Sequence, residues 1–256
     1  MAPTTLAGVL IVVGSALLGV AGLIAVARWL PEARRDGDND VKGVFFGAVA
    51  VLYAVLLAFV VVSVWSDFSD AGKATQAEAT RASALLRDAT AFPADERTRV
   101  RRRVLGYLRV VADDEWETLA SGRPSPAAIR AYDALWSEYA RLRPSGPGAE
   151  TMYRESIARL NELGENRELR VIASQASVPT PMWILLIAGA VVFVTFAYLF
   201  RMVSLTVHAI SVGAIAALVG FVLFLIFALQ RPYTGDVQIS ADPFLHVLSD
   251  WQGRVL

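Results

Sequence analysis

Four apolar runs without an acidic side chain, a lysine or an arginine constrain this chain more than any other feature of its sequence. They are Leu6 to Ala27, Gly43 to Ser66, Pro181 to Phe200 and Met202 to Gln230. Each run is long enough to cross a bilayer as a helix, because about 20 apolar residues span its hydrocarbon core. We expect membrane helices at about residues 6–27, 43–66, 181–200 and 205–229. The chain is therefore expected to be an all-α, multi-pass protein embedded in the lipid bilayer, with its four membrane helices in two hairpins.

The two hairpins enclose a charged middle segment. The boundaries predict a first hairpin at residues 1–66, a helical extramembrane domain at 67–177, a second hairpin at 178–230 and a C-terminal tail at 231–256. The segment from Asp67 to Arg170 holds 34 of the 48 charged residues, 17 basic and 17 acidic. Because the two signs balance, the domain lacks a polyelectrolyte-binding surface, and no nucleic acid partner is expected.

The residue types that carry catalysis are scarce. The chain has no cysteine and only two histidines, which lie far apart in the sequence. It also lacks a glycine-rich phosphate loop and a zinc-binding pair at helical spacing. We therefore expect no enzyme activity and no cofactor.

Basic residues near the ends of the apolar runs leave the orientation open. Five lie on the side of the first loop, and six lie on the side of the domain and the tail, so the positive-inside rule favours neither side. The five are Arg28, Arg34, Arg35, Lys42 and Arg201, and the six are Lys73, Arg81, Arg167, Arg170, Arg231 and Arg254. Met1 to Thr5 has no positive side chain, so the first run is expected to be a retained helix rather than a signal peptide.

The second apolar run continues a heptad pattern past the end of its membrane segment. The pattern predicts one continuous helix of 50 residues from Gly43 to Phe92, before Pro93. We call its membrane part the seam: Gly43, Gly47, Ala50, Ala54, Leu57, Val61 and Val64. Small residues in GxxxG spacing favour close helix packing in lipid. The alternative places the seam around the axis of a ring of subunits, where Leu57, Val61 and Val64 would form a hydrophobic neck.

Farther along the same pattern, Glu78 is a carboxylate on an otherwise apolar or small row, and it needs a partner. A local ion pair with Arg81 or Arg87 is sufficient to explain it.

The extramembrane domain is expected to consist of helices. Pro93 is suited to a helix start, and an apolar face then extends to Trp116. Ser125 can cap a second helix with Pro126 in its first turn. A last helical stretch extends from Ala149 to about Ser177, with a weak break at Gly164.

Two clusters of charged residues and one histidine resemble functional sites. The arginines at 97, 99 and 101–103 could bind anionic lipid, but a solvated face with Asp95 paired to Arg99 is favoured. The acidic residues at 113–115 and 117 have no loop geometry that would select a divalent cation, so no metal site is expected. His208 is an ionisable group inside the fourth run, which makes it a functional candidate unless it reaches the interface.

The chain resembles the bestrophin-like family of bacterial membrane proteins over roughly Val41 to Phe244. One group of matching residues is Tyr53, Leu56, Leu57, Ala58, Phe59, Trp65, Ala71 and Ala79, with Tyr107 farther along. The remaining motif positions are Glu78, Glu115, Trp116, Arg167, Arg170, Pro181, Trp183, Pro232 and Gly235.

The resemblance implies a pentameric anion channel whose second helix lines the pore, with the termini and the domain in the cytoplasm. Only Asp236, Asp242 and Asp250 follow the fourth run, so the acidic cluster that binds calcium in true bestrophins is missing. We expect an inner-membrane protein that self-associates through its second helix and conducts anions. The alternative is a non-conducting membrane-anchored scaffold whose helical domain binds a protein partner of unknown identity.

Overall fold

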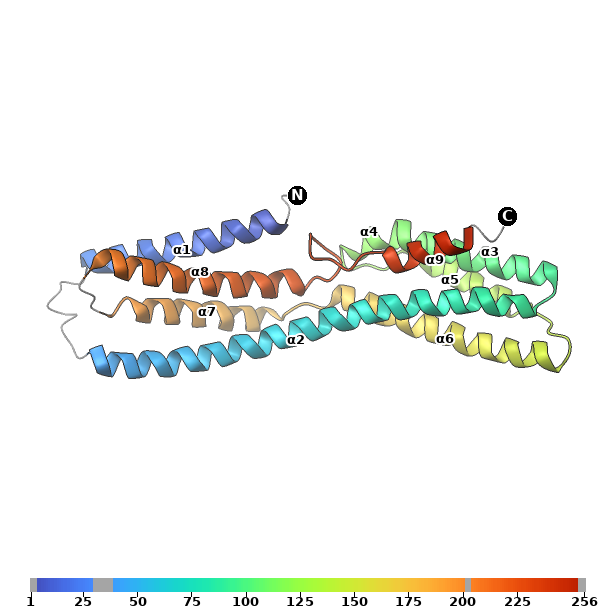
Figure 1. Cartoon of the computed structure of the whole chain (residues 1–256), viewed down its shortest axis with the longest axis horizontal. Coiled ribbons are helices and arrows are strands. Elements are labelled where there is room, and N and C mark those ends of the chain that lie inside the picture. The colour runs from blue at the N-terminus through green and yellow to red at the C-terminus, as the bar shows by residue number, and fades with distance from the viewer. Residues whose placement is uncertain (1–3, 30–38, 201–203, 253–256) are drawn as a thin grey trace. The chain divides into compact units, whose positions relative to one another are not determined.

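The computed structural model describes residues 4–29, 39–200 and 204–252. These residues form helices and connecting turns with no strand, and four of the helices are long and apolar enough to cross a membrane. The predicted all-α class and the four membrane helices are therefore confirmed. Figure 1 shows the elements in chain order. The chain divides into two compact units, of which unit 1 contains the apolar helices and unit 2 contains residues 67–176 with most of the C-terminal segment.

Unit 1 contains α1 (Thr4–Trp29), the first part of α2 (Asn39–Asp88), α7 (Thr180–Ala197) and α8 (Leu205–Leu229). α1 packs along α8, and small residues bring their backbones together. A Cβ on Gly19 would lie 2.7 Å from the Cβ of Ala216, and one on Gly8 would meet the ring of Phe224. This is the close packing through small residues that drives helix association in lipid.

Aromatic residues join α2 to α7 within unit 1. The ring of Phe46 stacks on that of Phe193 at 5.1 Å between centroids. Tyr53 donates a hydrogen bond of 2.9 Å to the carbonyl oxygen of Leu186. Gly189 leaves room for the ring of Tyr53, which occupies the space that a side chain there would need.

Unit 2 is built around the second part of α2. After a short 3-10 turn, the chain continues through α3 (Ala94–Val110), a π-helical turn η3 (Val111–Glu115), α4 (Trp116–Leu119), α5 (Pro126–Tyr139), α6 (Pro147–Gln175) and α9 (Asp242–Gln252). Ser125 caps α5 as predicted, since its side chain accepts hydrogen bonds from the backbone N–H groups of Ala127 and Ala128. One apolar core joins α2, α3, α5, α6 and α9.

Two expectations for this unit are corrected. α6 continues without a break through Gly164, because the glycine makes room for the hydroxyl end of Tyr132 rather than ending the helix. The tail also contains α9, a helix that was not expected from the sequence. Its apolar residues Phe244, Leu248 and Trp251 are buried in the core of unit 2.

Candidate functional site

The largest fully buried side chain of the described residues is a cation, Arg170 on α6. Its Nε donates to Oε2 of Glu78 at 2.6 Å, and its Nη2 donates to Oε1 of the same carboxylate at 3.1 Å. The same Nη2 also donates to Oε2 of Glu115 at 2.6 Å. Two parallel N–H···O bonds to one carboxylate make the strongest kind of ion pair in proteins. α2, η3 and α6 are thereby joined inside unit 2.

Two further side chains, Arg167 and Tyr107, join these three residues. We call the five together the buried network: Glu78, Glu115, Arg167, Arg170 and Tyr107. Arg167 donates from Nη2 to Oε1 of Glu115 at 2.6 Å, and the hydroxyl of Tyr107 donates to Glu78. The backbone N–H of Ser125 also points to Glu115, at 3.3 Å. Two carboxylates and two guanidinium groups leave the network with no net charge.

The network is stable only as a complete set, because burying an isolated charge costs several kcal/mol. Burial lowers the pKa of Arg170, but the adjacent carboxylates of Glu78 and Glu115 outweigh it, so the pKa of Arg170 is raised. Burial and the charge of Glu78 raise the pKa of Tyr107 well above its ordinary value. The Tyr107 hydroxyl therefore remains a hydrogen-bond donor across neutral pH.

Aromatic rings enclose the remaining faces of Arg170. Its guanidinium carbon lies 5.4 Å from the ring centroid of Trp116 and 5.7 Å from that of Phe244. Cation–π attraction is strong where the cation is desolvated, as it is here. Trp116 is itself held by a hydrogen bond of 3.0 Å from Nε1 to the carbonyl oxygen of Ile239. Residues from the C-terminal segment therefore close the site.

The π-helical turn accounts for the position of Glu115. An extra residue in a helical turn shifts the face that follows, and such turns recur at functional sites. Glu115 is fully buried, whereas Asp113, Asp114 and Glu117 are exposed. Within the described residues no group of acidic or histidine side chains is arranged to hold a metal ion. Both oxygens of Glu115 are already hydrogen-bonded to arginines.

Several local pairings expected from the sequence are wrong. Glu78 pairs with Arg170, 92 positions along the chain, rather than with Arg81 or Arg87. Arg81 instead pairs with Glu162, at 2.6 Å. A local pair satisfies an exposed carboxylate, but the Glu78 side chain is fully buried and its partner comes from another helix.

The arginine cluster also differs from expectation in its partner. Arg99 binds Glu138 on α5 at 2.7 Å rather than Asp95. Arg101 lies over the ring of Trp251, 5.1 Å from its centroid. The cluster thus contributes to packing within unit 2, while Arg102 and Arg103 are exposed.

The other motif positions lie outside the network. Pro181 is in the first turn of α7, and Nε1 of Trp183 donates to Oε1 of Gln230 at 3.3 Å. The carbonyl oxygen of Pro232 accepts a hydrogen bond of 2.8 Å from the N–H of Ile239. Gly235 has φ +80°, a left-handed conformation that favours glycine. These four residues shape turns and helix ends.

His208 is buried in unit 1. Its Nε2 lies 3.0 Å from the carbonyl oxygen of Ala197, so the imidazole joins α8 to the end of α7. This contact gives the residue a structural partner.

Four of the basic residues that were counted for the membrane orientation lie outside the described residues: Arg34, Arg35, Arg201 and Arg254.

The residues of the seam on α2 differ in how deeply they are buried. Gly47 and Ala54 are exposed and Gly43, Ala50 and Val61 are half-buried, whereas Leu57 and Val64 are buried. No atom lies within 4 Å of a Cβ placed on Gly43 or Gly47. Part of the seam lines an apolar pocket of about 460 Å³ between α2, α7 and α8. Its seam residues are Ala50, Ala54, Leu57 and Val61. The assignment of the seam to a pore or a subunit contact stays a prediction.

Comparisons with known proteins agree on the fold. Two crystal structures of variants of a bacterial bestrophin homologue from Klebsiella pneumoniae superpose with a TM-score of 0.72. Sequence identity is 16% and 15%, and the alignments cover 95% and 96% of this chain and 98% of each of those chains. A crystal structure described as a variant of a membrane protein also gives a TM-score of 0.72, at 16% identity, covering 94% of this chain and 97% of that one.

No curated protein matches the chain. The family model described as the Bestrophin-like domain matches residues 13–244, which include part of α1, the other three membrane helices and the buried network. The chain therefore belongs to the bestrophin-like family of membrane proteins.

Proposed function

We propose that this protein is the subunit of an oligomeric anion channel of a bacterial inner membrane, in which α2 of each subunit lines the axis. Family membership and the shared fold support a channel. The observation that carries the proposal is an exposed row of valines on the membrane part of α2. It comprises Val44, Val51, Val55 and Val62, which we call the valine row.

The valine row lies opposite the face through which α2 packs on its own chain. At 3.6 residues per turn, successive positions are about 100° apart, so Val55 and Val62 lie roughly 160° and 140° around the helix from Leu57. Val55 and Val62 are 48% and 65% exposed, whereas Leu57 is only 9% exposed. Leu57 and Val64 are buried within one subunit, and Val61 lines the pocket inside it, so these three side chains face away from a shared axis. We therefore assign the neck to the valine row in place of Leu57, Val61 and Val64.

The small residues of the seam lie between these two faces of α2. Gly43, Gly47, Ala50 and Ala54 are roughly 20° to 80° around the helix from Leu57. This is the position that a neighbouring α2 would contact in a ring, and small residues permit a close approach. A ring of apolar valine side chains would control conduction by excluding water from a narrow pore.

Unit 2 is proposed to be cytoplasmic, as the family resemblance implies. The exposed Thr80 on α2 in unit 2 offers a test, because the natural chain contains no cysteine. In intact cells, Thr80→Cys should resist a membrane-impermeant thiol reagent and react after the cells are opened. Reaction in intact cells would place the unit outside.

Native mass spectrometry and anion flux test the assembly. Protein released in mild detergent should give one defined ring of four or more subunits, with five expected from the family resemblance. Reconstituted vesicles should then pass anions faster than protein-free vesicles. A monomer or dimer without flux would favour the non-conducting scaffold that binds a partner through its helical unit.

A further inference from the structure

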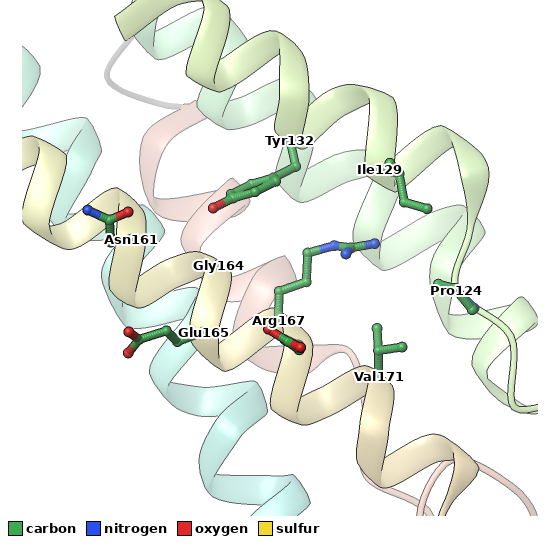
Figure 2. A pocket seen from close by; sticks show the side chains of 9 residues that line it. Pro124, Ile129, Tyr132, Asn161, Gly164, Glu165, Arg167 and Val171 are labelled. Atoms are coloured by element: carbon green, nitrogen blue, oxygen red, sulfur yellow. The ribbon is translucent and has the colours of Figure 1, made fainter.

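Unit 2 contains an open pocket of about 380 Å³ between α5 and α6, next to the buried network. Figure 2 shows the guanidinium of Arg167 extending from α6 toward Ile129 on α5. Pro124 and Val171 form the apolar wall around it, together with Ile129. A pocket of this size accommodates a small ligand with a few polar groups. Nothing in the proposed channel function requires it.

Arg167 has donor groups that the network does not use. It donates from Nη2 to Glu115, its Nε is buried without a partner, and its Nη1 forms no hydrogen bond within the described part of the chain. The Nη1 end is therefore the donor group left for a ligand. A guanidinium carries five N–H donors and can serve two carboxylates, as Arg170 does one turn away. The side chain is 13% exposed, so it borders the pocket without being sealed off. Arg167 can therefore bind a ligand carboxylate without releasing Glu115.

A simple anion does not suit this pocket, because Glu165 and Glu168 also line it. Neither carboxylate forms an ion pair with any residue that the structure describes. Counted with Arg167, the pocket has an excess of one negative charge, which opposes an anion and favours a ligand that also carries a positive group.

Helical geometry identifies the carboxylate that a bifunctional ligand would reach. Glu168 lies about 100° around α6 from Arg167, and Glu165 lies about 160° from it. Gly164 and Val171, which also line the pocket, fall between Arg167 and Glu168 on the helix. In Figure 2 the Glu165 carboxylate points away from the Arg167 guanidinium. Glu168 is thus the carboxylate on the pocket face nearest to Arg167.

We propose that this pocket binds a zwitterionic α-amino acid with an apolar side chain, such as leucine. The ligand carboxylate would bind Arg167, its ammonium group would bind Glu168, and its alkyl side chain would pack against Ile129 and Val171. An α-amino acid carries both charges on one carbon, so it can bridge side chains on neighbouring parts of one helix face.

Equilibrium binding to the purified full-length protein in mild detergent tests the proposal. Leucine is compared with isocaproate, which lacks the amino group, and isoamylamine, which lacks the carboxylate. Leucine should bind saturably, and each analogue should bind at least tenfold more weakly, because each loses one charge-assisted hydrogen bond. The absence of saturable leucine binding, or equal binding of either analogue, overturns the proposal.

Variants locate the site without disturbing the network. Ile129→Trp fills the pocket from an exposed position and should abolish leucine binding. Glu168→Gln should weaken leucine binding at least tenfold. Glu150→Gln, at an exposed position near the start of α6, should change nothing.

Unaltered leucine binding by Ile129→Trp, with folding confirmed by circular dichroism, would place the ligand elsewhere and overturn the proposal. The binding assay does not depend on conduction, so its failure and the failure of the channel proposal are separately visible.

Discussion

The two units of this chain differ in where their apolar side chains lie. Unit 2 encloses one large apolar core and a neutral set of buried charges. Unit 1 leaves most of its apolar side chains on the surface, and its helices meet mainly through glycines and aromatic rings. In water, exposed apolar area is unfavourable, so a helical domain must complete its own core. In lipid that driving force is absent, and apolar faces remain available for neighbouring subunits.

The largest test of this contrast is Arg170→Met. The variant leaves Glu78 and Glu115 buried with their principal cation removed, so we expect a loss of about 3–5 kcal/mol in the stability of unit 2. Thermal unfolding of the purified protein, followed by circular dichroism, measures it. Arg154→Met on the same helix removes an exposed pair with Glu150 and should change stability by less than about 0.5 kcal/mol. Similar effects for the two variants would show that the network is dispensable.

A second test compares two glycines of unit 1. Gly19→Leu adds a side chain where α1 meets α8, and overpacking should cost about 3 kcal/mol and loosen the subunit. Gly47→Leu adds the same side chain where no atom lies within 4 Å of its Cβ, so each subunit should fold but the ring should dissociate.

Denaturant titration in detergent and native mass spectrometry separate the two outcomes. A normal ring in Gly47→Leu would contradict the close-packed contact between subunits.

A third test removes a single hydroxyl from the buried network. Tyr107→Phe deletes the donor to Glu78 and should destabilise unit 2 by about 2 kcal/mol, because a hydrogen bond to a charged group is lost. Tyr153→Phe is the matched control, since its hydroxyl binds only a backbone carbonyl oxygen at 3.3 Å. A larger loss of melting temperature in the control would mean that the network tolerates an incomplete set of partners.

The smallest test compares two glycines within helices of unit 2. Gly106→Ala on α3 meets nothing within 4 Å, so it should stabilise the protein by up to about 1 kcal/mol through better helix propensity. Gly164→Ala gains the same propensity but displaces Tyr132, and we expect a net loss of about 1 kcal/mol. Melting temperatures that rise in both variants would show that Tyr132 moves aside at little cost.

Sequence patterns predicted the membrane helices and the helix start at Ser125, because both depend only on residues close together in the sequence. Long apolar runs specify membrane helices whatever surrounds them, and Ser125 with Pro126 marks a helix start through its own hydrogen bonds. Gly164 was misleading because glycine weakens a helix but also makes room for a neighbour, and only the position of Tyr132 shows which effect applies. The tail also carries a pattern that indicates α9, since its apolar residues recur at helical spacing at Phe244, Leu248 and Trp251.

The site was predictable in its members but not in its pairings. The family resemblance singled out Glu78, Glu115, Trp116, Arg167 and Arg170, and the structure brings all five together. Helical periodicity describes one helix at a time, so it predicted an ion pair between Glu78 and Arg81 on the same helix. Pairing across helices depends on how elements pack, which one sequence does not reveal.

Thiol modification during anion flux measures the central claim, an axis lined by the valine row of α2, most directly. Flux through vesicles containing the natural protein, which has no cysteine, should not respond to a membrane-impermeant thiol reagent. Flux through vesicles containing Val55→Cys should stop when the reagent is added, whereas Leu57→Cys should be unaffected. Block at Leu57→Cys with Val55→Cys unaffected, or no flux above that of protein-free vesicles, would contradict this account.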